Sequence, residues 1–438
     1  MRKRNILSII LVITIGGAGL SIGLFYFFNQ DSVIQEPPSL FQILWNQTWG
    51  GNSSEGVYTI NLDLEDDVYL VGSTDSFGSP KSAFLKYNNT GSLQRDSKSG
   101  GAIGSIASDP ILNSYIAEEN LTYPPSGVVY STNLHKYNSS GDLQWSIPDL
   151  AMGRVLADLD GNAYLSAQDR YEVHIAKFNT SGDLQWNMTW NSIEYLVGTQ
   201  TAIDLMGNVY IAGANDPVSG YFNIILVKFN STGDLQWEIT WGGSDTDNFY
   251  EIGIDSLGNI YLSGITFGSP DTLFLVKYSS TGVWQWDYIW NAAHSSDETI
   301  AISFDSSNNV YVMGLRGNPS TADVSLIKIN TLGSHQWTRS WGGTDHDQPI
   351  LIELDSEDNI YVAGRTESFG AGLYDIFLLK YNSTGDFQGE FIWGGTDMES
   401  LSGIALDSSE NIHLTGNTLS FGAGNSDIFL IKLSQDIS

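Results

Sequence analysis

The stretch Trp237–Asp255, WEITWGGSDTDNFYEIGID, belongs to a unit of about fifty residues that recurs along the chain. The unit also contains GNIYLSG (258–264), FLVKYSSTG (274–282) and WQW (284–286). The copies share, with exceptions, two Trp positions four residues apart, a Gly-Gly pair, acidic residues, an apolar run ending in Asp, a turn with Asn and two further apolar runs. A fixed period of this length indicates a repeat protein whose units bury their apolar faces against their neighbours.

Four strands, here named A to D, are predicted in each unit. Strand A is the run that ends in Asp, as in EIGID (251–255), and strand B is IYLSG (260–264). Strand C is FLVKY (274–278), and strand D is LQWEITW (235–241). Residues alternate between apolar and polar, and no helical period separates the strands, so the sheets are predicted to be antiparallel. The Asp that ends strand A aligns the copies at Asp63, Asp109, Asp158, Asp204, Asp255, Asp305, Asp355 and Asp407.

Four-stranded antiparallel units of this length are typical of β-propeller blades. We therefore predict an all-β, eight-bladed β-propeller over residues 41–438, with seven blades as the alternative if the unit that contains Pro110 is not a blade. The repeats begin with a lone strand D, which contains Trp45 and Trp49, and stop after the strand C that ends at Leu433. The first strand is therefore predicted to complete the last blade and to close the ring.

Three recurring motifs carry a family resemblance. They are D-S-x-G-N-I-Y-x-x-G, F-L-x-K-Y-N-S-T-G-D-x-Q-W and W-G-G-x-D. Together they resemble the bacterial and archaeal β-propeller repeat family called SBBP, over residues 41–438 and most weakly in the second and third units. The resemblance implies a propeller and an extracytoplasmic location, and it implies no catalytic residues.

Composition excludes several classes of function. The 438 residues include 50 acidic and 19 basic side chains, a formal net charge of −31, and this field would repel a nucleic-acid backbone. The absence of Cys excludes disulfides, thiolate metal ligands and Cys nucleophiles. The chain contains no HExxH, GxSxG, phosphate-loop or dinucleotide motif. We therefore predict no catalytic residues.

The first forty residues predict attachment to a membrane. Residues 1–5 form a basic flank, and residues 6–28 are uncharged and long enough to span a bilayer as one helix. The basic flank should stay in the cytoplasm, which places the propeller outside the cell. Residues 29–40 are then a polar linker. A cleaved signal peptide, followed by secretion of the propeller, is the alternative.

Acidic residues follow strand D in several units. By strand direction, the loops that carry them lie on one rim of the propeller. Crowded carboxylates repel one another unless they are bridged, and oxygen ligands suit Ca²⁺. The alternative is that each acid caps its own Gly-Gly turn by accepting backbone N–H groups. The candidate metal ligands are Asp245, Asp247, Asp345, Asp347, Asp397 and Glu399, with Asp297 and Glu298 at the same place in another unit.

Two further recurrent positions are predicted to be structural. The Trp pairs are predicted to pack between neighbouring blades rather than to bind sugars, because each ring buries a large area and a ligand site does not need to recur in every unit. The repeated Lys of strand C is predicted to pair with an acid or a turn carbonyl of its own blade rather than to form an anion channel. These lysines are Lys86, Lys136, Lys177, Lys228, Lys277, Lys328, Lys380 and Lys432.

The turns between strands carry two more motifs. The segment Asp158–Asn162 is interpreted as an A–B turn rather than a calcium loop, because no ligand stands at the twelfth position. Glycosylation sequons occur in the C–D turns, which would be exposed outside the cell. The predicted acceptors are Asn88, Asn138, Asn179, Asn230 and Asn382.

The regularity of the repeat favours a binding protein over an enzyme, because an active site requires some blades to depart from the pattern. We predict a monomeric cell-surface propeller that acts as a binding or adhesion module for a protein or a glycan, with Ca²⁺ as the candidate cofactor. The alternatives are an extracytoplasmic glycan lyase or hydrolase and a structural component of the cell envelope. The second and third units, with the insertion Glu118–Val128, are where we expect a specific site.

Overall fold

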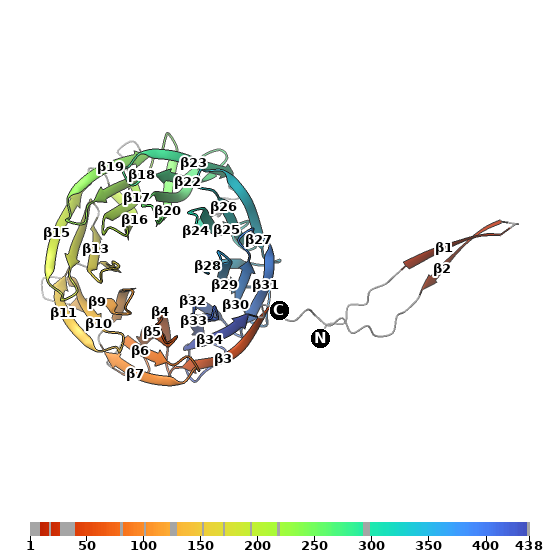
Figure 1. Ribbon diagram of the computed structural model, residues 1–438, viewed down its shortest axis with the longest axis horizontal. Helices are drawn as coiled ribbons and strands as arrows, with labels where there is room; N and C mark the ends of the chain where they lie inside the picture. Colours follow the sequence, from red (N-terminus) through yellow and green to blue (C-terminus); the bar gives the residue numbers. More distant parts are fainter. Residues whose placement is uncertain are drawn as a thin grey trace. The chain divides into compact units, whose positions relative to one another are not determined.

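The computed structural model describes residues 9–16, 19–26, 40–78, 82–99, 102–122, 129–150, 153–169, 171–192, 195–216, 220–291 and 298–435. It divides into two compact units, Met1–Ser39 and Leu40–Ser438. The second unit is a ring of eight four-stranded sheets, each antiparallel throughout (Figure 1). The predicted eight-bladed propeller is therefore confirmed, and the seven-bladed alternative is wrong.

Each blade runs from the centre of the ring outward in the order of strands A to D (Figure 1). Blade 1 contains β4 (Glu55–Leu62), β5 (Val68–Thr74), β6 (Ser82–Tyr87) and β7 (Leu93–Ser99), and blade 2 contains β8 (Ala102–Ser108), β9 (Ser114–Thr122), β10 (Val129–Tyr137) and β11 (Leu143–Leu150). Blade 3 contains β12 (Arg154–Ala157), β13 (Ala163–Asp169), β14 (Glu172–Phe178) and β15 (Leu184–Asn191), and blade 4 contains β16 (Tyr195–Ile203), β17 (Val209–Asp216), β18 (Asn223–Phe229) and β19 (Leu235–Trp241). Blade 5 contains β20 (Thr246–Ile254), β21 (Ile260–Phe267), β22 (Thr272–Tyr278) and β23 (Trp284–Asn291), and blade 6 contains β24 (Glu298–Phe304), β25 (Val310–Arg316), β26 (Asp323–Ile329) and β27 (His335–Trp341). Blade 7 contains β28 (Asp347–Leu354), β29 (Ile360–Thr366), β30 (Asp375–Tyr381) and β31 (Phe387–Trp393), and blade 8 contains β32 (Glu399–Leu406), β33 (Ile412–Thr418), β34 (Asp427–Gln435) and β3 (Phe41–Trp49).

The ring closes through β3, the first strand of the propeller in sequence. It pairs antiparallel with β34, from Phe41 opposite Gln435 to Trp49 opposite Ile428. The end residues of β3 are both buried, with Phe41 3% and Trp49 8% exposed. Blade 8 is therefore built from both ends of the propeller sequence, as predicted, and no strand of that blade is left without its neighbour.

The recurrent Trp residues join neighbouring blades. The ring of Trp241 in blade 4 packs on Phe274 in blade 5 with ring centres 4.2 Å apart. The first Trp of each pair lies under the C–D turn of the next blade, as Trp186 shows: its indole N–H donates to the carbonyl of Ser231 at 3.0 Å. A Cβ added to Gly233 in that turn would lie 3.0 Å from the Trp186 ring. The prediction that the Trp pairs pack between blades is confirmed for these residues, whereas Trp290 lines a cavity that is described below.

The Asp that ends strand A organises the A–B turn. The carboxylate of Asp255 accepts the backbone N–H of Leu257 at 3.0 Å and of Asn259 at 2.9 Å, and it also accepts the hydroxyl of Tyr261 at 3.2 Å. Asp158 has the same role in blade 3, where it accepts the backbone N–H of Asn162 at 2.8 Å. The interpretation of Asp158–Asn162 as a turn is confirmed, and the recurring Asp, Asn and Tyr are explained by it.

The repeated Lys connects two blades rather than one. Lys277 Nζ lies 3.8 Å from the carboxylate of Asp255 in its own blade and 4.9 Å from the centre of the Tyr261 ring. It also donates to the carbonyl of Thr331, in the C–D turn of blade 6, at 3.4 Å. The same contact to the next blade joins Lys136 to Thr180, Lys228 to Ser280, Lys328 to Ser383 and Lys432 to Asn89. The predicted acid partner is present at Lys86, Lys177, Lys277, Lys328 and Lys432, but the carbonyl partner, where there is one, belongs to the following blade.

The Asp carboxylates that end strand A allow the response of the fold to acid to be predicted. Burial raises the pKa of Asp407, but hydrogen bonds from His413, Lys432 and Asn411 outweigh it and hold the pKa well below its usual range. A carboxyl whose pKa is depressed in the folded state stabilises the fold above its unfolded pKa of about 3.9, and this contribution is lost as the pH falls below that value. The pKa is also lowered at Asp63, Asp158 and Asp305.

We therefore expect the melting temperature to change little between about pH 7 and pH 5 and to fall steeply below about pH 4. The measurement is thermal unfolding across a pH series. The Asp407→Asn variant should melt lower at neutral pH and lose less stability on acidification than the parent. A melting temperature that is the same at about pH 3 as at neutral pH would contradict the expectation.

Residues 9–26 differ from the prediction. The structure contains two antiparallel strands there, β1 (Ile9–Gly16) and β2 (Gly19–Tyr26), so the helix predicted over residues 6–28 is not supported. Residues 1–8, 17–18 and 27–39 lie outside the described residues. The described part of the chain has no helix that is long and apolar enough to cross a membrane. An apolar run alone does not distinguish a helix from strands, and this one is rich in Ile, which favours extended structure, and in Gly, which permits a turn.

Candidate functional site

The predicted rim acids fall into two groups. Asp245, Asp345 and Asp397 are exposed, whereas Asp247, Asp347 and Glu399 are buried at the start of strand A, with 2%, 0% and 1% exposed. Among the described residues, no three His, Cys, Asp or Glu side chains gather in a group that could hold a metal ion. Asp297 lies outside the described residues, and Glu298 begins β24. The six candidate ligands are therefore not brought together at one point.

The buried group caps the Gly-Gly turns, as the alternative interpretation stated. Asp347 accepts the N–H of Gly343 at 2.8 Å and the hydroxyl of Ser368 at 2.7 Å through one oxygen, and it accepts the hydroxyl of Thr366 through the other. Glu399 accepts the N–H of Gly395 at 2.9 Å in the same way. These carboxylates hold each D–A loop against the end of strand B.

The predicted glycan acceptors lie in C–D turns, where each Asn has a structural role. In Asn230, the side-chain oxygen accepts the N–H of Thr232 at 3.1 Å and of Asp234 at 2.8 Å, and the amide donates to the Asp234 carboxylate at 3.2 Å. The same side-chain oxygen closes the turn at Asn88, Asn138, Asn179 and Asn382. The recurrence of these Asn residues is thus explained by turn geometry, and their glycosylation stays a prediction.

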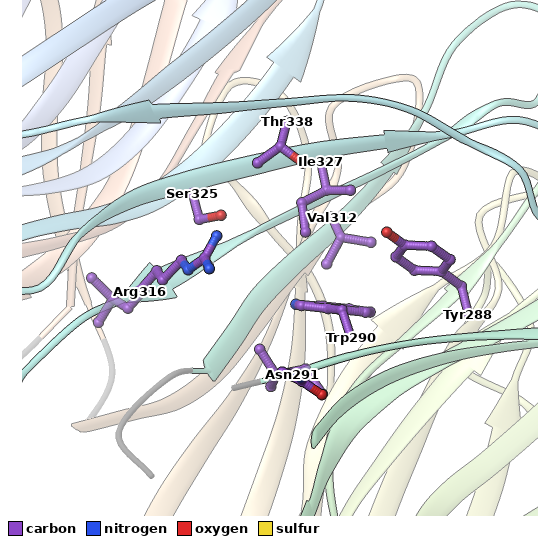
Figure 2. Close-up of a pocket in the computed structure, with 11 residues that line it drawn as sticks. Tyr288, Trp290, Asn291, Val312, Arg316, Ser325, Ile327 and Thr338 are labelled. Carbon is purple, nitrogen blue, oxygen red and sulfur yellow. The ribbon is translucent and has the colours of Figure 1, made fainter. Parts of the chain in front are cut away.

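A cavity of about 230 Å³ lies between blades 5 and 6 (Figure 2). Two aromatic side chains of β23, Tyr288 and Trp290, form one wall, and Arg316 and Ser325 of blade 6 lie opposite (Figure 2). The remaining lining residues are apolar or neutral. They are Leu273, Asn291, Val312, Gly314, Leu315, Ile327 and Thr338.

The cavity forms because Ser325 replaces a Phe of the repeat. Ser325 lies opposite Gly314 in the sheet, and Phe377 occupies the same position opposite Gly364 in blade 7. In blades 5, 7 and 8 this Phe fills the space beside the Trp of the preceding blade. The pairs and their ring-centre distances are Trp241–Phe274 at 4.2 Å, Trp341–Phe377 at 4.6 Å and Trp393–Phe429 at 4.8 Å. Ser325 is too small to fill it, so the Trp290 ring faces open space.

Two other departures from the repeat make one end of the cavity polar. Arg316 lies opposite Asp323, at the place where Thr366 lies opposite Asp375 in blade 7. Asn291 follows Trp290 where four units have the first Gly of the Gly-Gly pair, and Asn191 follows Trp190 in the same way. Both Arg316 and Asn291 are exposed, and within the part of the chain that the structure describes Arg316 forms no ion pair. A guanidinium and an amide therefore stand free beside the aromatic wall.

The aromatic wall is held in place by blade 6. The Tyr288 ring stacks on His335 with centres 6.0 Å apart and planes 12° from parallel, and it lies 5.3 Å from the Trp290 ring. His335 in turn lies 2.8 Å from the hydroxyl of Thr338. Burial raises the pKa of Tyr288, so its hydroxyl stays protonated near neutral pH and can donate a hydrogen bond.

The cavity does not lie in the second and third units, where a specific site is predicted near the insertion Glu118–Val128. Residues 123–128 of that insertion lie outside the described residues, so a site there stays a prediction. The cavity lies instead at the junction of two regular blades. Its three sequence signals are single substitutions in the repeat, at Asn291, Arg316 and Ser325.

Comparisons with known proteins do not assign a family. No protein-family model matches the chain. The regulatory protein FlaEY of Caulobacter vibrioides is 23% identical over 233 residues, which are 50% of this chain and only 20% of that relative. The resemblance to SBBP repeats therefore stays a prediction.

Solved structures with a similar fold have diverse functions. They include the polysaccharide lyase Uly1, with 10% identity, a TM-score of 0.48, and coverage of 77% of this chain and 91% of that chain. They also include a prolyl endopeptidase with 13% identity and a TM-score of 0.49, covering 83% of this chain and 55% of that chain. A protein of unknown function from Dyadobacter fermentans has 10% identity and a TM-score of 0.40, covering 91% and 100%. Such distant likenesses do not extend to a function.

Proposed function

We propose that this protein is a monomeric, membrane-attached, extracytoplasmic β-propeller of the SBBP type that binds a glycan, without catalysis, in the cavity between blades 5 and 6. The observation that supports it is the break in the repeat at this junction. In blades 5, 7 and 8 a Phe packs against the second Trp of the preceding blade, whereas here Ser325 leaves Trp290 facing a cavity that also contains a guanidinium.

The chemistry of the lining suits one sugar ring. Aromatic faces pack against the C–H groups of a sugar, and hydroxyl, amide and guanidinium groups bond its polar edge. A cavity of about 230 Å³ is smaller than most drug-sized pockets and accommodates a single ring. Because guanidinium groups bind carboxylate and sulfate through paired hydrogen bonds, we propose that Arg316 contacts an acidic sugar, such as a uronic acid.

The enzyme alternative, a lyase or hydrolase, is less well supported by this lining. Among the described residues that line the cavity, none is a carboxylate or a histidine, so the usual acid and base groups are missing from it. Tyr288 is the only phenol there, and its raised pKa opposes a role as a base near neutral pH. Binding therefore accounts for the arrangement better than turnover.

The test is a binding measurement on the full chain in detergent, with oligosaccharides that carry or lack uronic acid. We expect binding of the acidic sugars, and we expect Arg316→Ala to weaken it by about 10- to 100-fold, the usual loss for a charge-assisted hydrogen bond. Arg154→Ala, which removes an exposed arginine of blade 3, is the matched control and should bind as the parent does. Equal binding by the parent and Arg316→Ala would contradict the proposal, and release of unsaturated products would favour the lyase.

Attachment to the membrane is proposed from residues 1–28. Their basic flank and uncharged run support insertion with the N-terminus in the cytoplasm. The full chain should sediment with membranes and resist extraction at high pH, whereas a chain that starts at residue 40 should not. Recovery of the full chain in the soluble fraction would contradict attachment.

A further inference from the structure

A second acidic position faces the capping carboxylates across the blade junctions. Between blades 7 and 8, Asp375 at the start of β30 and Glu399 at the start of β32 approach the same glycine, Gly394. A Cβ added to Gly394 would lie 1.6 Å from Asp375 Oδ1 and 2.5 Å from Glu399 Oε2. The two carboxylates therefore approach the same point, which they can do only because glycine has no side chain there.

The same arrangement recurs at two neighbouring junctions. Between blades 8 and 1, a Cβ on Gly50 would lie 1.7 Å from Asp427 Oδ1 and 2.6 Å from Glu55 Oε2. Between blades 6 and 7, a Cβ on Gly342 would lie 2.0 Å from Asp323 Oδ1 and 2.8 Å from Asp347 Oδ2. Three consecutive junctions, including the one beside the closing strand, thus bring two carboxylates together.

One oxygen in each pair is buried without a partner. Asp375 and Asp427 are each 1% exposed, and within the described residues Oδ1 of each accepts no hydrogen bond. Oδ1 of Asp323 is also buried and accepts none. A buried carboxylate oxygen that loses water without gaining a donor destabilises the fold, so native proteins rarely leave one unpaired. The arrangement points to a missing positive partner.

The other oxygens of the two acids accept hydrogen bonds from the protein. Asp375 Oδ2 accepts the N–H groups of Ala371 at 2.6 Å and Gly372 at 3.1 Å. Glu399 accepts the hydroxyl of Thr418 at 2.7 Å and the N–H of Gly395 at 2.9 Å. Hydrogen bonds of this kind stabilise carboxylates, yet two carboxylates side by side repel each other. A hard cation between them would remove the repulsion and would supply the partner that Oδ1 lacks.

Blades 4 and 5 form a natural comparison. A Cβ on Gly242 would lie 2.2 Å from Asn223 Oδ1 and 2.4 Å from Asp247 Oδ2, so an amide replaces one carboxylate at this junction. Asp247 Oδ2 is also buried and accepts no hydrogen bond within the described residues. Reversing the Asn223 amide would direct its N–H₂ group at this oxygen and would satisfy it without a cation. The acid pair is therefore not required by the blade packing itself.

We propose that the junctions between blades 6 and 7, 7 and 8, and 8 and 1 each bind a Ca²⁺ ion through their paired carboxylates. The ion fastens strand C of one blade to strand A of the next, and it does so on the part of the ring where the chain ends meet. This site differs from the predicted rim, because the exposed Asp245, Asp345 and Asp397 do not take part.

The test is titration of the chelator-treated full chain with CaCl₂, read by calorimetry and by the melting temperature. We expect about three ions per chain and a rise in melting temperature of several degrees once Ca²⁺ exceeds its dissociation constant about 100-fold. Asp375→Asn and, independently, Asp427→Asn should each remove one equivalent of bound ion and reduce the rise. Asp247→Asn, at the junction that already has an amide, is the matched control and should retain all the equivalents.

Three outcomes would overturn the proposal. The first is the absence of both heat and a change in melting temperature on adding CaCl₂. The second is a loss of bound ion in Asp247→Asn equal to that in Asp375→Asn, which would indicate a diffuse effect of charge. The third is a metal-free chain that is stabilised by mild acid and unaffected by Ca²⁺, which would show that each acid pair shares a proton instead.

Discussion

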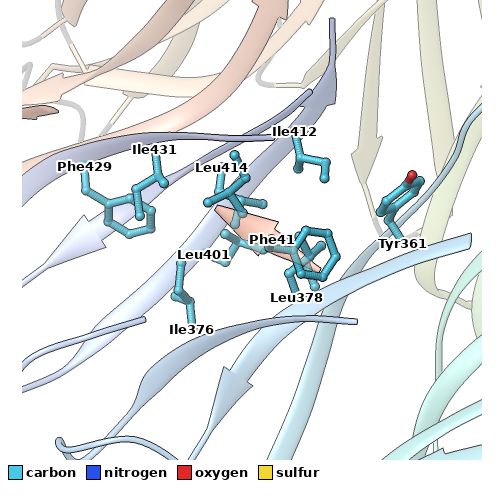
Figure 3. Close-up of a cluster of buried hydrophobic side chains, with 11 residues drawn as sticks. Phe41, Tyr361, Ile376, Leu378, Leu401, Ile412, Leu414, Phe429 and Ile431 are labelled. Atoms are coloured by element: carbon cyan, nitrogen blue, oxygen red, sulfur yellow. The ribbon is translucent and has the colours of Figure 1, made fainter. Parts of the chain in front are cut away.

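Removal of residues 41–50 is expected to lower the melting temperature of the propeller by about 10 °C or more. Figure 3 shows Phe41 of β3 within a buried cluster that includes Leu378, Leu401 and Leu414 of blades 7 and 8. Trp49, at the other end of the strand, is also buried. Loss of one aromatic side chain from a core costs about 3–5 kcal/mol, and this deletion removes two together with the hydrogen bonds to β34.

The matched pair for this experiment is a chain that begins at residue 40 and one that begins at residue 51. The first keeps β3 and should melt as the full chain does, whereas the second exposes the edge of β34 and should also self-associate, since an unpaired strand edge recruits other strands. Thermal unfolding by circular dichroism and size-exclusion chromatography measure the two effects. Equal melting of the two truncated chains would show that ring closure does not contribute to stability.

The blades could be predicted because each structurally important residue recurs at the same position in many of the repeats. The Asp of the A–B turn, the Gly of the C–D turn and the paired Trp each recur with one local role, so a degenerate copy such as the one with Pro110 does not hide the pattern. The order of strands at the two ends of the repeats also predicts which strand closes the ring. The N-terminal segment occurs once, and its apolar run gives no such check between helix and strand.

The sequence analysis singled out only one member of each acid pair. Asp347 and Glu399 stand out after the Gly-Gly motif, but their partners Asp323 and Asp375 begin strand C of the preceding blade, where they resemble ordinary strand-end residues. Contacts between blades depend on how neighbouring sheets are rotated, and alternation within one strand carries no information on that. The exposed first acid of each loop was grouped with the buried second acid for the same reason.

The cavity was missed because its signals are distributed over three strands. Asn291 ends β23, Arg316 ends β25 and Ser325 lies in β26, so the substitutions are separated by up to 34 residues in the chain. Each one alone resembles normal variation within a repeat. Only the ring geometry places them around one Trp, which shows that departures from a repeat should be compared across adjacent units.

Exchanging Phe377 and Ser325, which occupy the same position at two blade junctions, is expected to have large and opposite effects. Phe377→Ser should create, beside Trp341, the cavity that exists naturally beside Trp290, and it should lower stability by about 3–5 kcal/mol, as large-to-small changes of buried aromatic residues do. Ser325→Phe is the reverse change, which inserts the Phe of the repeat into the existing cavity. It should leave the melting temperature unchanged or raise it by a few degrees, because it buries apolar area in space that is already open.

The two variants separate the stability of a junction from its function. Ser325→Phe should abolish sugar binding while the protein becomes no less stable, whereas Phe377→Ser should lower the melting temperature and leave binding between blades 5 and 6 intact. Thermal unfolding and the oligosaccharide titration, applied to both variants, measure the two properties side by side. A strongly destabilised Ser325→Phe would show that the cavity does not have the shape of the missing Phe. A fully stable Phe377→Ser would show that the Trp–Phe contacts do not hold the blades together. The absence of such a contact at Trp290 would then not indicate a ligand site.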